Sequence, residues 1–521
     1  MSKKIRLFAC SLVFLSACAV RSTISPTAIP AVPRPDPSAA LIIAEAGSLL
    51  ERGGYIHLKR AFDLYGEVDR LVRMDVETAE KFLKTSVLLD IRAKDLGVFN
   101  DGYLATAQRL IDDRPELAAF RRYLDIAALL KVKTAGVLND DLDQDIKYSS
   151  LKDSAMENES FKAESWRDPV LTSLMAALRI SMPATGLDHQ DLREAAERFP
   201  KNLYLKFQIS CLPPGDPKLW DEIQNADPEY YEVMAARGER TLAEKKVLSA
   251  EADLLAAHNS IPESPLLAIH LASLYFALEE YDQSLEFYEK TLLVKSDYKE
   301  AELGRAISLS CLGRPAEAVP ILKALIEKGP SLRGECHYWL ASNQRELSDL
   351  AAAAESIEAA KPLLRRSQVF TLSGLIALER SLVEQAEKDL KEAIRINPED
   401  EAAFFLLGKV YAQKGLWNES GLNFMMAGYG YEREEKELEL LATQIGESSM
   451  AEPRKAKLLL RKRNQVEKAR LTRATAYYNA AAGFYNAGEP GRARDWAERS
   501  AFHAVFTSKA KEFMVLIGNK R

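Results

Sequence analysis

A rhythm of small residues with a period close to 34 runs through the sequence between residues 264 and 428. Five small residues follow one another at separations of 34, 35, 33 and 34: Ser284, Ala318, Ala353, Ala386 and Ser420. Twelve residues before each stands another small residue: Ala272, Ala306, Ala341, Gly374 and Gly408. Four residues after each stands a bulky apolar one: Tyr288, Leu322, Ile357, Leu390 and Phe424. A fixed period of this length is typical of stacked helical hairpins, in which small residues let two helices cross closely. The pattern predicts an all-α solenoid.

The spacing resembles that of the tetratricopeptide repeat. Residues 387–420 (EKDLKEAIRINPEDEAAFFLLGKVYAQKGLWNES) are close to a full signature of that family, and Pro330 and Pro398 stand where the family often ends its second helix. Four residues depart from the family pattern: Arg305, Leu325, Ser373 and Gln344. The resemblance covers about a third of the chain and implies a right-handed superhelix with five regular hairpins from about Pro265 to Gly428.

The N-terminus has the pattern of a lipoprotein signal peptide. Lys3, Lys4 and Arg6 precede an apolar stretch from Leu7 to Leu15, which is too short to span a bilayer. The following Leu-Ser-Ala-Cys resembles the bacterial lipoprotein box, which implies cleavage before Cys18 and acylation of that cysteine. An ordinary secretory peptide with an incidental cysteine is the alternative. The resemblance to bacterial lipoproteins also implies that Ala19, after the cysteine, favours sorting to the periplasmic side of the outer membrane.

The remaining sequence divides into segments of different character. Residues 1–17 form the signal peptide, and residues 18–38, with five prolines, form an extended tether. Residues 39–260 are interpreted as degenerate helical repeats, interrupted by a polar stretch at 139–164, and residues 261–430 form the regular array. Residues 431–521 are predicted to hold one long helix over about 454–482 and a final hairpin near Ala493.

The segment from Arg454 to Arg473 is basic, with nine Lys or Arg and one Glu. Such a face would suit phosphate groups of a lipid or polymer, or an acidic partner. The alternative is a solvated face that packs beside the acidic segment from Glu432 to Glu439. The formal net charge is −6, and removal of the three signal-peptide cations takes it to −9. This charge gives no general attraction for nucleic acid.

Motifs of catalysis are missing from the sequence. The six histidines are scattered without an HExxH or another close metal pairing, and there is no Walker A loop, GxGxxG or GxSxG. We therefore predict no catalytic, cofactor or metal site. An enzyme with an unrecognised site stays open as an alternative, because a missing motif does not exclude one.

The concave face of the array is the expected binding surface, for an extended peptide or a helix of another protein. In the family, defined positions of each first helix face this groove, and the strongest candidates there are Tyr338, Arg345, Phe405 and Lys409. The groove positions lack the Lys and Asn cluster of the family's carboxylate-clamp members. Some of these residues are alternatively expected to pack against the next repeat.

Three classes of function follow from these observations. The first is a non-catalytic interaction scaffold that assembles an envelope complex for pili or secretion, polysaccharide export or cell-wall machinery. The second is a periplasmic chaperone or carrier for an envelope client, and the third is the unrecognised enzyme. Stable partners would indicate a scaffold, whereas many transient partners would indicate a chaperone.

Overall fold

The computed structural model describes most of the chain as helices joined by short turns. It covers residues 37–98, 100, 102–134, 168–181, 190–212, 216–244, 246–448 and 450–518. Helices make up nearly all of these ranges, which contain no β-strand, so the all-α prediction is confirmed. The signal peptide, Cys18, all but the end of the tether and the polar stretch 139–164 lie outside them. In these ranges no helix has both the length and the hydropathy to cross a bilayer.

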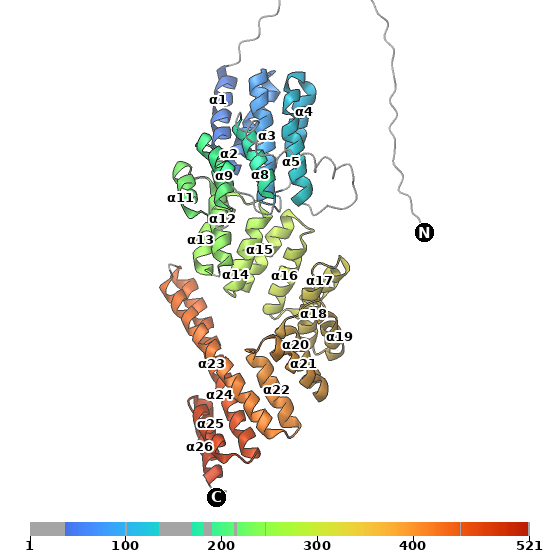
Figure 1. Cartoon of the computed structure of the whole chain (residues 1–521), viewed down its shortest axis with the longest axis vertical. Coiled ribbons are helices and arrows are strands. Elements are labelled where there is room, and N and C mark those ends of the chain that lie inside the picture. The colour runs from blue at the N-terminus through green and yellow to red at the C-terminus, as the bar shows by residue number, and fades with distance from the viewer. Residues whose placement is uncertain are drawn as a thin grey trace, which may run out of the picture.

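The regular repeats form consecutive antiparallel helical hairpins (Figure 1). Their helices are α14 (Pro265–Ala277), α15 (Tyr281–Val294), α16 (Lys299–Cys311), α17 (Pro315–Glu327), α18 (Arg333–Glu346), α19 (Leu350–Ala360), α20 (Ser367–Glu379), α21 (Val383–Ile396), α22 (Glu401–Gln413) and α23 (Trp417–Glu447). The first four hairpins and the last, formed by α22 and the start of α23, keep the register predicted from the small residues.

The small residues lie where the two helices of a hairpin cross. A Cβ atom on Gly374 would come within 2.6 Å of the Leu390 side chain, closer than two such atoms can approach. In other hairpins a serine side chain reaches across the crossing: Ser284 Oγ donates to the Ala272 carbonyl and Ser420 Oγ to the Gly408 carbonyl, both at 2.9 Å. The period of small and bulky residues therefore encodes the distance between paired helices.

The turn inside each regular hairpin has one residue in the left-handed backbone region. These residues recur with the repeat and have φ between 59° and 73°: Glu279, Gly313, Ser348, Ser381 and Gly415. The next amide after each bonds back into the first helix, as Glu280 N does to the Tyr275 carbonyl at 2.8 Å. This is the Schellman arrangement, which satisfies carbonyl groups left open at a helix end.

The N-terminal section is also helical but less regular. It contains α1 (Pro37–Arg52), α2 (Tyr55–Leu71), α3 (Val76–Asp95), α4 (Gly102–Asp113), η1 (Pro115–Phe120), α5 (Arg121–Thr134), α8 (Pro169–Ser181), α9 (Gln190–Arg198), α10 (Leu203–Ser210), α11 (Pro217–Ala226), α12 (Tyr231–Ala243) and α13 (Val247–Ser260). Ala46, Ala61 and Tyr65, which echo the repeat pattern, are fully buried between α1, α2 and their neighbours. A continuous apolar core joins this section to α14 and α15.

A buried arginine ties three helices of the N-terminal section together. The Arg92 guanidinium in α3 lies 4.2 Å from the Tyr204 ring centroid and 5.1 Å from that of Phe207, both in α10. It also donates to the Glu232 carboxylate in α12 and is completely shielded from solvent. A buried charge of this kind is stable only when it is paired, so the three helices depend on one another here.

The C-terminal section is built on a long antiparallel hairpin. Helix α23 continues without a break through the boundary expected at residue 430, and α24 (Glu452–Asn486) returns alongside it, as the long-helix prediction required. Helices α25 (Pro490–Ser500) and α26 (Ala504–Gly518) complete the section. Arg470 and Arg473 pair with Glu435 of α23 at 2.7 and 3.1 Å. This half of the basic segment therefore packs beside the acidic helix.

Candidate functional site

The structure places the four predicted groove residues on the first helices α18 and α22, in different environments. Tyr338 in α18 is half-buried, and its ring packs edge-on against Trp339 with centroids 5.5 Å apart. The Arg366 guanidinium, just before α20, lies 5.7 Å from the Tyr338 ring centroid. Burial raises the pKa of the Tyr338 hydroxyl. Tyr338 thus contributes to the contact between neighbouring repeats.

Arg345 is engaged by the next repeat. Its Nη1 donates to Glu379 Oε1 of α20 at 2.9 Å, across 34 positions of the chain, and the two side chains are 28% and 34% exposed. The pair therefore links the C-terminal ends of the successive first helices α18 and α20. A carboxylate ligand would have to compete with Glu379 for this guanidinium.

Phe405 and Lys409 lie together on α22. Phe405 is half-buried and packs edge-on against Phe424, with ring centroids 5.3 Å apart, and against Tyr431 at 6.3 Å. Lys409 is exposed, and its ammonium nitrogen lies 5.0 Å from the Phe405 ring centroid. The two residues form a cation over an aromatic face, a surface that offers both charge and apolar area. Contact of any of the four residues with a partner stays a prediction.

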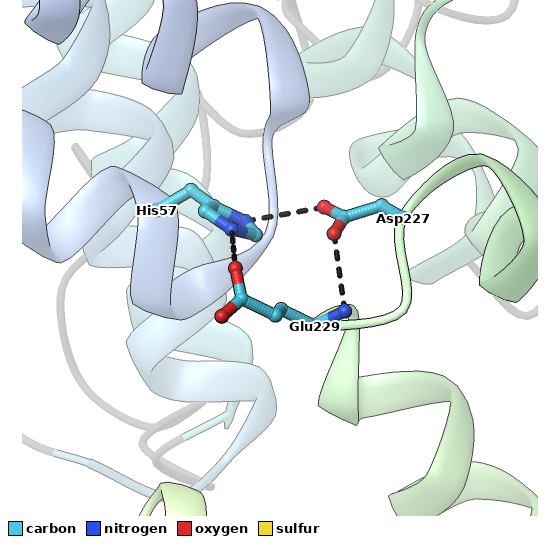
Figure 2. A group of neighbouring side chains, drawn as sticks. All are labelled: His57, Asp227 and Glu229. Atoms are coloured by element: carbon cyan, nitrogen blue, oxygen red, sulfur yellow. Dashed lines mark hydrogen bonds and ion pairs between the residues drawn. The ribbon is translucent and has the colours of Figure 1, made fainter.

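A second group of chemically active side chains was not predicted from the sequence. Figure 2 shows His57 of α2 between Asp227 and Glu229 of the loop that joins α11 to α12. His57 Nδ1 lies 3.2 Å from an Asp227 carboxylate oxygen, and Nε2 lies 3.2 Å from a Glu229 oxygen. His57 and Asp227 are buried, whereas Glu229 is exposed. The Nε2–Glu229 contact has hydrogen-bond geometry, whereas Nδ1 and Asp227 are within ion-pair distance without forming a hydrogen bond.

Arg52 completes this group as an internal counter-ion. At the end of α1 its guanidinium donates to Asp227 and, at 3.2 Å, to Glu229. The pKa of Glu229 lies below its ordinary value, chiefly because its carboxylate accepts from His57. The side-chain ligand atoms lie within 4.8 Å of one another, but a cation bound there would have to displace Arg52 from both carboxylates. We interpret the group as a charge network that joins α1 and α2 to the α11–α12 loop.

No sequence pattern predicts this network, because its members are far apart along the chain. His57 and Glu229 are separated by 172 positions, and neither belongs to a motif. For the same reason, a third group of charged side chains could not be predicted. In this group the start of α24 contacts the first regular hairpin. The basic segment that begins at Arg454 was recognised from its charge, but Glu251, Glu279 and Glu280, the acidic partners of its first half, were not.

Comparisons with known proteins give partial likenesses. No family model matches the sequence. The human protein O-mannosyl-transferase TMTC1 is 24% identical over 183 residues, which are 34% of this chain, and the chain spans only 20% of that relative's length. Pseudomonas aeruginosa PilF shares 12% identity, with 48% of this chain and 95% of PilF aligned at a TM-score of 0.36. A tetratricopeptide repeat protein of Parabacteroides merdae shares 15% identity, with 55% of this chain and 98% of that protein aligned at a TM-score of 0.34.

The hairpins themselves define the fold. From Pro265 onward each pairs two helices, turns through a left-handed residue and places a small residue at the crossing with a bulky one beside it. These features recur at the 34-residue period. The geometry of its own repeats gives this chain the fold of an all-α solenoid of the tetratricopeptide-repeat type.

Proposed function

We propose that the chain is a non-catalytic interaction scaffold, anchored by lipid at Cys18 on the periplasmic side of the outer membrane. In this role it holds protein partners during assembly of an envelope complex for pili or secretion, polysaccharide export or cell-wall machinery. The lipoprotein box, Ala19 and the proline-rich tether support the location, and the array supports the mode of binding.

The observation that carries the proposal is the row of equivalent first helices α14, α16, α18, α20 and α22. Repeated helices at one register build an extended surface, which is the geometry that repeat proteins use to bind a peptide or helix along its length. Exposed side chains at the groove positions of this row are mostly polar: Glu300, Glu346, Gln368, Glu379, Lys409 and Gln413. Half-buried apolar residues such as Phe405 lie among them.

The described ion pairs narrow the place where a partner would be held by charge. Arg345 is already bound to Glu379, whereas Lys409 contacts only the face of the Phe405 ring among the interactions described. The Lys409–Phe405 surface is therefore the strongest single point of recognition in the proposal. It suits a partner segment in which a carboxylate stands beside an apolar side chain.

Site-specific photo-crosslinking in the native host tests the proposal. A photoreactive amino acid at Lys409 is expected to give discrete adducts with partner proteins. Lys388, equally exposed on the second helix α21, is the matched control and is expected to give none. A few stoichiometric adducts would support a scaffold, and many weak ones the chaperone alternative. Equal labelling from both positions, or none from either, would contradict binding at this face.

A further inference from the structure

The tip of the α23–α24 hairpin returns to the beginning of the regular array. Figure 1 shows this tip beside α13 and α14, two helices that are far from α24 in the sequence. Arg454, Arg461 and Lys462 of α24 contact three glutamates: Glu251 in α13 and Glu279 and Glu280 in the turn between α14 and α15. Arg454 is 174 positions from Glu280 and 203 positions from Glu251 in the sequence. Lys462 is 183 positions from Glu279.

Arg454 is the centre of this contact. Its Nη1 lies 2.6 and 2.7 Å from the two Glu251 oxygens, and its Nε lies 3.0 Å from both oxygens of Glu280. Tyr275 donates its hydroxyl to Glu251 at 3.0 Å and holds that carboxylate in place. One guanidinium therefore bridges two carboxylates from two different helical hairpins, with a geometry that a lysine would not reproduce.

The remaining contacts centre on the left-handed turn residue Glu279. Lys462 Nζ donates to Glu279 Oε1 at 2.7 Å, the Arg461 guanidinium donates to the Glu279 carbonyl, and Gln465 donates to the other carboxylate oxygen. Lys462 is 2% exposed and Glu280 is also 2% exposed. Charges this well shielded are stable only when paired, so each side of the contact needs the other to remain in place.

The ion pairs described at this interface are made by long charged side chains, and the Arg454 guanidinium also lies 5.4 Å from the Tyr275 ring centroid. Met450, in the loop before α24, adds a partly buried apolar contact to the N-terminal core. Polar contacts between sections of a chain allow relative motion more readily than large apolar contacts do. A solenoid otherwise makes contacts only between neighbouring repeats. This contact is therefore an additional link between the first regular hairpin and the C-terminal section.

We propose that the α23–α24 hairpin is a releasable strap that closes the solenoid. In the closed state Arg454, Arg461 and Lys462 hold its tip on the surface formed by Glu251, Glu279 and Glu280, so that the chain from α14 to α24 forms a ring. Release of the tip opens this ring without unfolding the hairpins. A partner that binds better to one of the two states shifts the balance between them. The strap does not depend on the lipid anchor or on the Lys409 surface.

Small-angle X-ray scattering of the full chain, with circular dichroism, tests the strap. The double variant Arg454→Glu/Lys462→Glu places like charges against the three glutamates and is expected to increase the radius of gyration and maximum dimension while helical content is retained. The matched control is Lys457→Glu/Arg463→Glu, which makes the same charge change at exposed positions of α24 and is expected to leave both dimensions unchanged.

A charge exchange separates release from unfolding. Lys462→Glu alone is expected to open the ring, and Glu279→Lys added to it is expected to restore the compact dimensions by reforming the pair in reverse. Unchanged scattering in the double variant would overturn the proposal. A loss of helical content that accompanies the expansion would also overturn it, because the contact would then be part of the folded core. Failure of the charge exchange to restore the dimensions would exclude the Glu279–Lys462 pair as part of a strap.

Discussion

At the scale of single residues, the hairpin turns separate the effect of backbone conformation from that of packing. Gly313 has a φ of 72°, and a Cβ atom added to it would meet no heavy atom within 4 Å. Gly313→Ala is therefore expected to lower the free energy of unfolding by about 1 kcal/mol through backbone strain alone. Thermal unfolding followed by circular dichroism measures the change.

A glycine-to-alanine substitution has the opposite expected effect on stability in the part of α23 beyond the array. Gly446 lies within α23, is exposed and also has open space around its Cβ position. Gly446→Ala is expected to stabilise the helix by about 0.5–1 kcal/mol, because alanine loses less conformational freedom there. Equal shifts for both variants would show that the turn residue is not held in the left-handed region.

Residues whose role depends on their size could be predicted from the sequence. Residues whose role depends on a hydrogen-bond partner could not. The small residues at the crossings were predicted because their spacing repeats. Departures from the family pattern could not be interpreted without the structure: Ser373 donates to Asp389 at 2.8 Å, and the Gln344 side chain lies 2.7 Å from Ser356 Oγ. In both cases a polar residue in the first helix is matched by one in the second helix of the same hairpin.

At the scale of helices, the close crossing of α20 and α21 sets a limit on side-chain size. Gly374→Ala is expected to be destabilising although alanine favours helices, because its methyl group would lie 2.6 Å from Leu390. Overpacking costs about 1–3 kcal/mol, which exceeds the gain of about 0.5–1 kcal/mol in helix propensity. Gly491→Ala in α25 has open space and is the control that reports propensity alone. A higher melting temperature for Gly374→Ala would contradict the register of this hairpin.

The start of α3 depends on a charged cap. Asp75 accepts from the Thr78 amide at 2.7 Å, and this hydrogen bond lowers the pKa of the carboxyl below its usual value of about 3.9. Asp75→Ala is expected to reduce the local stability of Val76–Asp95 by about 1 kcal/mol at pH 7, measured by hydrogen exchange of its amides.

The effect of Asp75 on stability should depend on pH with a defined sign. Because the folded-state pKa lies below the unfolded-state value, the stabilisation is complete above about pH 3.9 and is lost as the pH falls through the folded-state pKa. The difference between wild type and Asp75→Ala is therefore expected to shrink in acid. Asp75→Asn retains a capping oxygen and should show a smaller loss at pH 7. A difference independent of pH would indicate that the charge has no role in the cap.

Helix boundaries could be predicted where Gly or Pro lies in a turn. They could not be predicted where a glycine inside a helix allows close packing. The long helix α24 was expected because no Gly or Pro interrupts residues 454–482. The continuity of α23 was not expected, since the regular array was predicted to end at residue 430. In the structure a Cβ atom at Gly428 would lie 2.1 Å from the Tyr477 ring, so this glycine permits the packing of α24.

At the scale of the whole molecule, local patterns could predict the array but not its long-range charge networks. A repeat of about 34 residues contains information on contacts within a hairpin and with the next one. The networks around His57 and Arg454 join groups more than 170 positions apart, and each uses common charged residues in no special order. Sequence composition shows that such charges exist, and only the fold determines which of them meet.

The location of the whole molecule depends on a single thiol in the prediction from sequence. Cys18→Ser is expected to abolish acyl labelling and to leave the precursor uncleaved, because the lipoprotein peptidase requires the acylated cysteine. Each buried CH₂ contributes about 0.8 kcal/mol to membrane binding, so two or more acyl chains give the mature protein a stable attachment. Cys10→Ser, within the apolar run of the signal peptide, is the matched control and should retain labelling. Labelling with radioactive palmitate and fractionation of membranes measure both effects. A Cys18→Ser protein that is correctly processed, free of lipid and still bound to the membrane would show that another element holds the array at the envelope.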